Sequence, residues 1–116
     1  MKIIVGKATE RFLKVSPRKV RQVIELVRNQ EVESALEALV HLNKGAAKEV
    51  RKAIQSALAS ARQNPEAKAA SLYIAKITAD EGPTRQGRRW RATAMGRAVH
   101  YRRRQTHLCV ELGVKK

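Results

Sequence analysis

The spacing of apolar residues differs between segments of this chain of 116 residues, and in three segments it predicts a β-strand. Residues 3–15 carry strand-forming side chains at both ends of a more polar middle, which predicts an extended segment. Residues 71–79 divide their apolar side chains between two faces. Residues 107–114 alternate strictly, and one face is formed by Leu108, Val110, Leu112 and Val114. Both of these later segments therefore predict strands.

Three other segments repeat apolar residues at helical spacing. The first begins at Ser16-Pro17, because Ser is a good N-cap and Pro fits the first helical position. Its apolar stripe is formed by Val20, Val23, Ile24 and Val27. A second helix is predicted over residues 31–42, and a third runs from a cap at Asn43 to about residue 63.

The stretch between the last two predicted strands is long and has no apolar run that could build a core of its own. Two strands around such an insertion predict a β-hairpin over about residues 80–107. If each arm stays extended, the hairpin reaches about 30 Å at roughly 3.3 Å per residue. A ribbon of this kind is only marginally stable alone in water. We therefore expect one domain, residues 1–116, with a hairpin that is ordered mainly against a partner.

Charge indicates what that partner is. The chain has 25 Lys and Arg residues against 10 Asp and Glu residues, for a formal net charge of +15. Such a density of positive charge repels itself unless a polyanion neutralises it. Nucleic acid is the first candidate partner, and an anionic membrane surface is the second.

The strongest cationic signal lies inside the predicted hairpin. Residues 85–104 contain no Lys and no acidic residue, and their arginines are Arg85, Arg88, Arg89, Arg91, Arg97, Arg102, Arg103 and Arg104. Arg suits planar, bidentate phosphate contact and stacking on bases, so we interpret this cluster as an RNA-binding surface. Trp90 stands among the arginines, where it either stacks on an unpaired base or covers the backbone of the ribbon.

A second basic surface surrounds the start of the first predicted helix. It consists of Lys14, Arg18, Lys19 and Arg21. Because a helix N-terminus attracts phosphate, these side chains are also predicted to contact nucleic acid. Ser16 is interpreted as a helix cap rather than as a ligand contact.

The sequence supports neither an enzyme nor a metal-binding protein. His41, His100 and His107 are scattered, and Cys109 has no second cysteine. His107 and Cys109 would share one face of a strand, but two ligands do not make a zinc site. We therefore predict no enzyme activity, no metal and no cofactor. No run of 18 apolar residues occurs, so no membrane-spanning helix is predicted. A single cysteine fits a reducing compartment, and the apolar stretch at the N-terminus is too short for a signal peptide, so we expect a cytosolic protein.

Two other binding classes compete with an RNA-binding protein. An architectural DNA-binding protein could use basic β-ribbon arms in the minor groove. Such proteins usually act as dimers, and the chain shows no large apolar dimer face beyond its own core stripes. A cationic membrane binder would need bulky apolar residues on a basic amphipathic helix. The most basic stretch has only Trp90, Met95, Val99 and Tyr101.

Several short motifs resemble one known family. They occur in the family's order and are Lys7-Ala8, Val15-Ser16-Pro17-Arg18-Lys19-Val20-Arg21, Ser56-Ala57-Leu58-Ala59-Ser60-Ala61, Asp80-Glu81-Gly82-Pro83-Thr84, Ala94-Met95-Gly96-Arg97-Ala98 and Thr106-His107-Leu108-Cys109-Val110-Glu111-Leu112. Across nearly the whole chain, the sequence is similar to the universal family of large-subunit ribosomal protein twenty-two. It departs from the family at Ala92-Thr93, where Pro-Arg is usual, so we carry over no contact through these two residues.

This resemblance implies an α+β fold, with a small antiparallel sheet packed with three helices and a long protruding cationic hairpin. It implies a structural constituent of the large ribosomal subunit that binds large-subunit ribosomal RNA, supports subunit assembly and contacts neighbouring ribosomal proteins. It also implies that the hairpin tip lines the exit tunnel and meets the nascent peptide. By correspondence, the tip region comprises Gly87, Arg88, Arg89, Trp90, Arg91, Met95 and Gly96.

Overall fold

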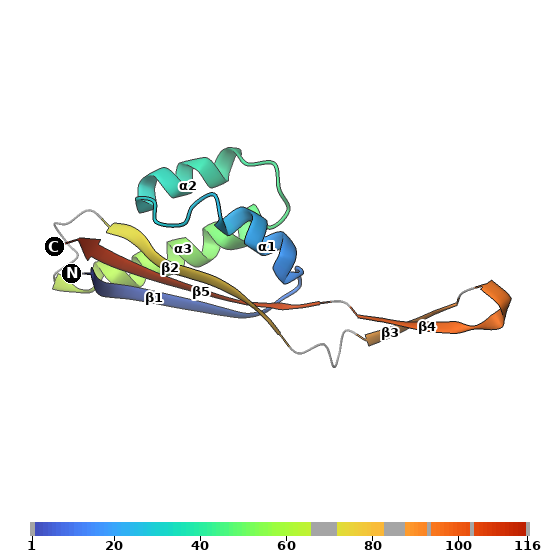
Figure 1. The fold of residues 1–116 in the computed structure, drawn as a ribbon. Helices are drawn as coiled ribbons and strands as arrows, with labels where there is room; N and C mark the ends of the chain where they lie inside the picture. The colour runs from blue at the N-terminus through green and yellow to red at the C-terminus, as the bar shows by residue number, and fades with distance from the viewer. Residues whose placement is uncertain (1, 66–71, 83–87, 93, 103, 116) are drawn as a thin grey trace.

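The computed structural model describes residues 2–65, 72–82, 88–92, 94–102 and 104–115. In chain order its elements are β1 (Lys2–Leu13), α1 (Pro17–Ile24), α2 (Val32–His41), α3 (Ala47–Arg62), β2 (Leu72–Glu81), β3 (Arg88–Ala92), a short 3-10 turn η3 (Ala94–Gly96), β4 (Ala98–Arg102) and β5 (Thr106–Lys115). Three helices pack on an antiparallel sheet, and a β-hairpin extends away from this body (Figure 1). The predicted α+β fold is confirmed.

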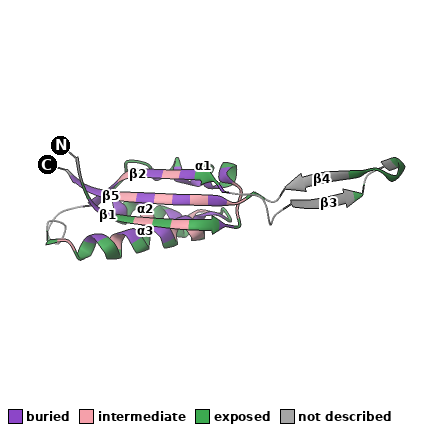
Figure 2. Cartoon of the chain, turned by 90° about the horizontal axis from the view of Figure 1, so that it is seen from below, coloured by how far each residue is buried: buried purple, intermediate pink, exposed green. Residues whose placement is uncertain are grey.

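The last strand of the chain, β5, lies at the centre of the sheet between β1 and β2 and is antiparallel to both. Its side chains alternate as the sequence predicts. Leu108, Val110 and Leu112 are fully buried in the core. His107 and Cys109 are half-buried and belong to the opposite face. Figure 2 shows this opposite face, in front of which no described helix lies.

The helices all cover the same face of the sheet (Figure 1). α3 packs against β1, α1 packs against β2, and α2 packs against α3. Small side chains let α3 approach β1 very closely. A Cβ atom placed on Gly6 of β1 would lie 2.6 Å from the Ala61 Cβ and 2.7 Å from the Ala57 carbonyl oxygen. The alanines of α3 therefore determine how deeply the helix sits on the sheet.

Two bulges interrupt the pairing of β1 with β5, one between Ile4 and Gly6 and one between Glu10 and Leu13. The second bulge contains Phe12, whose φ of 59° is left-handed and uncommon for a bulky residue. An extra residue on one strand bends that strand and redirects its side chains. β1 consequently turns at Phe12, just before the chain enters α1.

The predicted start of the first helix is confirmed, whereas the predicted start of the third helix is wrong. Ser16 is the N-cap residue of α1 and Pro17 is its first residue, as predicted, but the Ser16 side chain makes no capping hydrogen bond. The predicted cap of the third helix at Asn43 is wrong, because Ala46 precedes the first turn of α3. Gly45 disfavours helix, and the residues before Ala46 form a loop that turns back toward α1.

The hairpin is a second, two-stranded sheet in which β3 pairs with β4. The hydrogen bond from the Gly82 N–H to the Gln105 carbonyl oxygen, 2.8 Å long, closes the ladder of the body at the base of the hairpin. β2 runs to Glu81 rather than to the predicted residue 79, because Asp80 and Glu81 still pair with β5. With the hairpin extended, the protein measures 65 × 26 × 21 Å.

Candidate nucleic-acid interface

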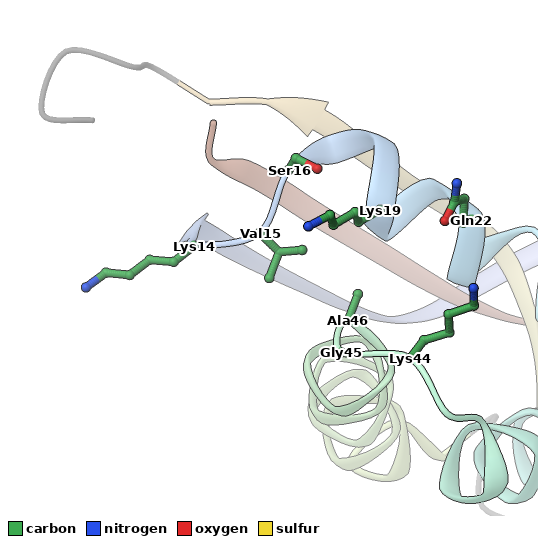
Figure 3. Close-up of a pocket in the computed structure, with 8 residues that line it drawn as sticks. All are labelled: Lys14, Val15, Ser16, Lys19, Gln22, Lys44, Gly45 and Ala46. Carbon is green, nitrogen blue, oxygen red and sulfur yellow. The ribbon is translucent and has the colours of Figure 1, made fainter. Parts of the chain in front are cut away.

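A basic pocket lies where the chain passes from β1 into α1 (Figure 3). We call it the lysine pocket. It is a half-open pocket of about 540 Å³, and its lining residues are Lys14, Val15, Ser16, Lys19, Gln22, Lys44, Gly45 and Ala46. Two segments far apart in the sequence meet here: the entry to α1 and the loop before α3.

The charge of the lysine pocket suits an anion. Lys14, Lys19 and Lys44 are all exposed, and none of the described residues that line the pocket is acidic. In Figure 3, Lys19 extends from α1 and Lys44 extends from the opposite loop toward Gln22. The pocket also borders the N-terminus of α1, where the first N–H groups have no acceptor within the helix. Ammonium groups beside a helix N-terminus form a typical environment for a phosphate group.

Two partly buried hydrogen bonds hold this side of the pocket in place. The Thr106 hydroxyl donates a hydrogen bond to the Val15 carbonyl oxygen at 2.6 Å. The Arg21 Nε donates another to the Ala79 carbonyl oxygen at 3.0 Å. The first bond fixes the segment that leads into α1 to β5, and the second fixes α1 itself to β2. Side chains on a rigid frame lose less conformational entropy when they bind than side chains on a loose loop.

The structure separates the four residues predicted for this surface. Lys14 and Lys19 line the pocket, whereas Arg18 and Arg21 lie outside its lining on exposed positions of α1. Arg21 already uses one N–H group to hold Ala79. The other N–H groups of its guanidinium can still donate hydrogen bonds to a phosphate, because Arg carries five donors in all.

Lys44 was not predicted from the sequence. It stands next to Gly45 in a short loop whose charge pattern is ordinary. Only the packing of α3 beside α1 brings Lys44 to the pocket that Lys14 and Lys19 also line. The local signal that could have found it is the Lys-Gly pair directly before a helix, which is weak evidence of an anion site by itself.

The hairpin carries the remaining predicted positions. β3 contains Arg88, Arg89, Trp90 and Arg91, and β4 contains Arg102. Arg88 opposes Arg102 in the register, so the hairpin places like charges at paired positions. Like charges so placed disfavour a ribbon in water unless anions neutralise them.

The turn between β3 and β4 contains two of the residues predicted for the tip. Met95 is 94 % exposed and has a φ of 65°, and Gly96 has a φ of 73°. Arg97 and Arg104 are exposed. The remaining predicted positions, Arg85, Gly87 and Arg103, lie outside the residues that the structure describes.

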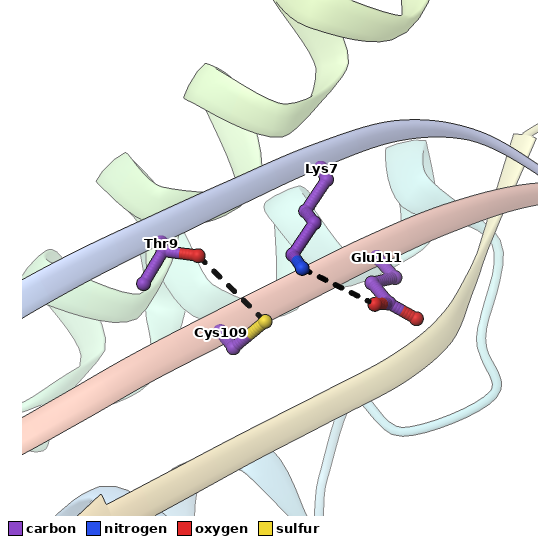
Figure 4. A network of polar contacts seen from close by, with 4 residues as sticks. All are labelled: Lys7, Thr9, Cys109 and Glu111. Carbon is purple, nitrogen blue, oxygen red and sulfur yellow. Dashed lines mark hydrogen bonds and ion pairs between the residues drawn. The ribbon is translucent and has the colours of Figure 1, made fainter.

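The helix-free face of the sheet shows how His107 and Cys109 are used. The Phe12 N–H donates a hydrogen bond to the His107 Nδ1 at 3.2 Å. The Thr9 hydroxyl lies 3.8 Å from the Cys109 Sγ and donates to it, beside the ion pair of Lys7 with Glu111 (Figure 4). Across the described part of the chain, no three His, Cys, Asp or Glu side chains gather as metal ligands would.

Among the helices that the structure describes, none has the length and apolarity needed to span a membrane.

Comparison with known proteins identifies the family. The family model described as "Ribosomal protein L22p/L17e" matches residues 8–113. Large ribosomal subunit protein uL22 of Halothermothrix orenii is 41 % identical over 111 residues, which are 96 % of this chain and 96 % of the relative. The proteins of the same name from Desulfitobacterium hafniense strain Y51 and Clostridioides difficile strain 630 are 44 % and 43 % identical, again over 96 % of this chain and over 96 % and 98 % of their own lengths. This chain therefore belongs to the ribosomal protein L22p/L17e family and is a structural constituent of the large ribosomal subunit.

Proposed function

We propose that the protein binds large-subunit ribosomal RNA through two surfaces, the lysine pocket and the arginine-rich hairpin. The observation that carries the proposal is that Lys14, Lys19 and Lys44 all line one pocket whose lining contains no acidic residue. The net charge of +15 and the run of arginines in residues 85–104 support it. Ribosomal RNA and neighbouring ribosomal proteins are then the protein's partners in the subunit.

The mechanism is electrostatic and geometric. RNA segments repel one another, and cationic side chains inserted between them neutralise phosphates and release condensed counterions. The body supplies a rigid set of ammonium groups, and the hairpin carries guanidinium groups away from the body along the 65 Å length of the molecule. One chain can thus join RNA segments that lie far apart, which supports subunit assembly. RNA shape and unpaired bases supply the specificity.

We further propose that the hairpin tip lines the nascent-peptide exit tunnel. The support is family membership together with the exposure of Met95 and the turn at η3. A Met95→Cys variant, in a Cys109→Ser background, should form a cross-link with a nascent peptide held on the ribosome when its new thiol is alkylated with a photoreactive maleimide and then irradiated. Ribosomes that carry this variant and form no such cross-link would contradict the placement of the tip.

Binding is tested first by competition. The purified protein should retain saturable binding to large-subunit ribosomal RNA in the presence of excess double-stranded DNA and unrelated RNA. Equal loss of binding to every competitor would instead support a general polyanion binder, with an architectural DNA-binding protein as the leading alternative. A dimer in gel filtration would support that alternative further.

The lysine pocket is tested by a matched pair of variants. Lys44→Gln removes an exposed lysine of the pocket, and Lys76→Gln removes an exposed lysine of β2 that is not part of it. Lys44→Gln should weaken binding and lower the slope of log affinity against log salt by roughly 1. Lys76→Gln should change both quantities much less. Equal effects of the two variants would show that the pocket is not a specific contact.

A further inference from the structure

An exposed aromatic pair stands where the body meets the hairpin. The rings of Phe12 and His107 contact each other edge to face, with centroids 5.0 Å apart and an interplanar angle of 85°. Phe12 is 54 % exposed and belongs to no part of the buried core. Aromatic residues are only 3 % of the chain, and more than half of the surface of this one is accessible to a partner.

The protein holds this ring in place by unusual backbone geometry. Phe12 adopts a left-handed φ of 59° inside the bulge of β1. Its N–H donates to the His107 Nδ1 at 3.2 Å, so ring and backbone are both tied to β5. On either side of the bulge the chain is anchored, by Leu13 in the core and by the bond from Thr106 to Val15. A bulky residue kept in a strained conformation without being buried indicates a functional position.

The surroundings favour a nucleotide as the partner. Arg11 and Lys14 flank Phe12 in the sequence and are exposed. Lys14 also lines the lysine pocket, so the aromatic ring and the phosphate-binding pocket share one short segment of chain. Asp80 pairs with His107 in the register, so an acidic residue neighbours His107 on the β2 side. An incoming anion is therefore favoured on the β1 side, where Phe12, Arg11 and Lys14 lie.

We propose that Phe12 is a stacking platform for an unpaired nucleobase of the bound RNA and that His107 is the residue that positions it. Aromatic side chains bind single-stranded bases in this way, since every base has a flat face. The phosphates of the same strand enter the lysine pocket. This inference rests on the proposed binding of ribosomal RNA and names one of its contacts.

The central test is a Phe12→Asn variant of the full chain. Asn tolerates a left-handed φ, so the bulge should form and the melting temperature should be retained. Binding to transcribed large-subunit ribosomal RNA should weaken by about 5- to 150-fold, the range expected for one lost base stack. The salt slope should stay the same because no phosphate contact is removed. Phe12→Tyr should bind the RNA with the same affinity as the wild-type protein.

A second readout locates the contact directly. Ultraviolet irradiation of the complex should produce an RNA adduct on the peptide that contains Phe12. His107→Ala should weaken binding in the unchanged protein but cause no further loss in Phe12→Asn, as expected for a residue that acts through Phe12. Leu26→Ala, which alters another half-exposed apolar side chain, is the matched control and should have no effect.

The outcomes separate the two proposals. If the unchanged protein does not bind ribosomal RNA selectively, the proposed function fails and this inference fails with it. If the unchanged protein binds selectively and Phe12→Asn binds equally well, only the stacking platform is overturned. In that case Phe12 and His107 serve to cover the bulge.

Discussion

The Thr106 hydroxyl donates a hydrogen bond of 2.6 Å to the Val15 carbonyl oxygen, joining the start of β5 to the segment that enters α1. Thr106 is completely buried. The two residues lie 91 positions apart in the sequence, so the bond connects the N-terminal part of the chain to its C-terminal part. It also holds the segment from Lys14 to Ser16, which forms one wall of the lysine pocket.

Replacing Thr106 by Val should destabilise the fold. The new side chain fills the same space but leaves the Val15 carbonyl oxygen without its donor. A fully buried acceptor left unpaired costs about 1–3 kcal/mol, and because this bond is only partly buried we expect a loss of about 1 kcal/mol in the free energy of unfolding. Urea denaturation measures this loss, and Thr106→Ser, which keeps the hydroxyl, should lose less. A Val variant as stable as the unchanged protein would show that the bond makes no net contribution.

Replacing Gly6 by Val should also destabilise the body, for a steric reason. Its Cβ would lie 2.6 Å from the Ala61 Cβ and 2.7 Å from the backbone oxygen of Ala57, so α3 would have to move off the sheet. Overpacking of this kind typically costs about 1–3 kcal/mol. Gly45→Ala is the control, because a Cβ there meets nothing within 4 Å. Thermal unfolding of the two variants should differ clearly, and similar melting temperatures would count against the close approach.

Glu10 should make stability depend on pH. Burial, together with the nearby charge of Glu49, raises the pKa of Glu10 above its ordinary value of 4.5, and Lys52 opposes this only in part. The folded protein therefore binds the proton more tightly than the unfolded chain does. Ionised Glu10 destabilises the fold once the pH rises above about 4.5, and the effect is absent at lower pH.

The matching variant is Glu10→Gln. It should melt at a higher temperature than the unchanged protein near neutral pH, and the difference should vanish below the ordinary pKa of a carboxyl group. Glu49→Gln should reduce the pH dependence, since it removes one cause of the raised pKa of Glu10. A difference that grows as the pH falls would have the wrong sign and would refute the assignment.

Shortening the hairpin should leave the body folded. In the described part of the chain, β3 and β4 pair only with each other, and the bond from Gly82 to Gln105 closes the body's own ladder. Residues 83–104 can therefore be replaced by Asn-Gly, which suits a two-residue hairpin turn. The melting temperature should be nearly unchanged, while binding to large-subunit ribosomal RNA and incorporation into the subunit should fall sharply. Unfolding of the shortened protein would show that the hairpin supports the body.

Much of the fold follows from local patterns. The stripe of Val20, Val23 and Ile24 predicts the buried face of α1, and the alternation from Leu108 to Val114 predicts β5. Both predictions succeed because apolar periodicity depends only on the repeat of the element itself. The sequence likewise predicts a polyanion as the partner, because net charge is a sum over residues and requires no coordinates.

The tertiary structure alone decides which distant residues meet. The placement of β5 between β1 and β2 brings Phe12 to His107, and the packing of α3 beside α1 adds Lys44 to the lysine pocket. Periodicity indicates which face of an element is buried. It carries no information about which other element covers that face, because that choice depends on contacts between segments far apart in the chain.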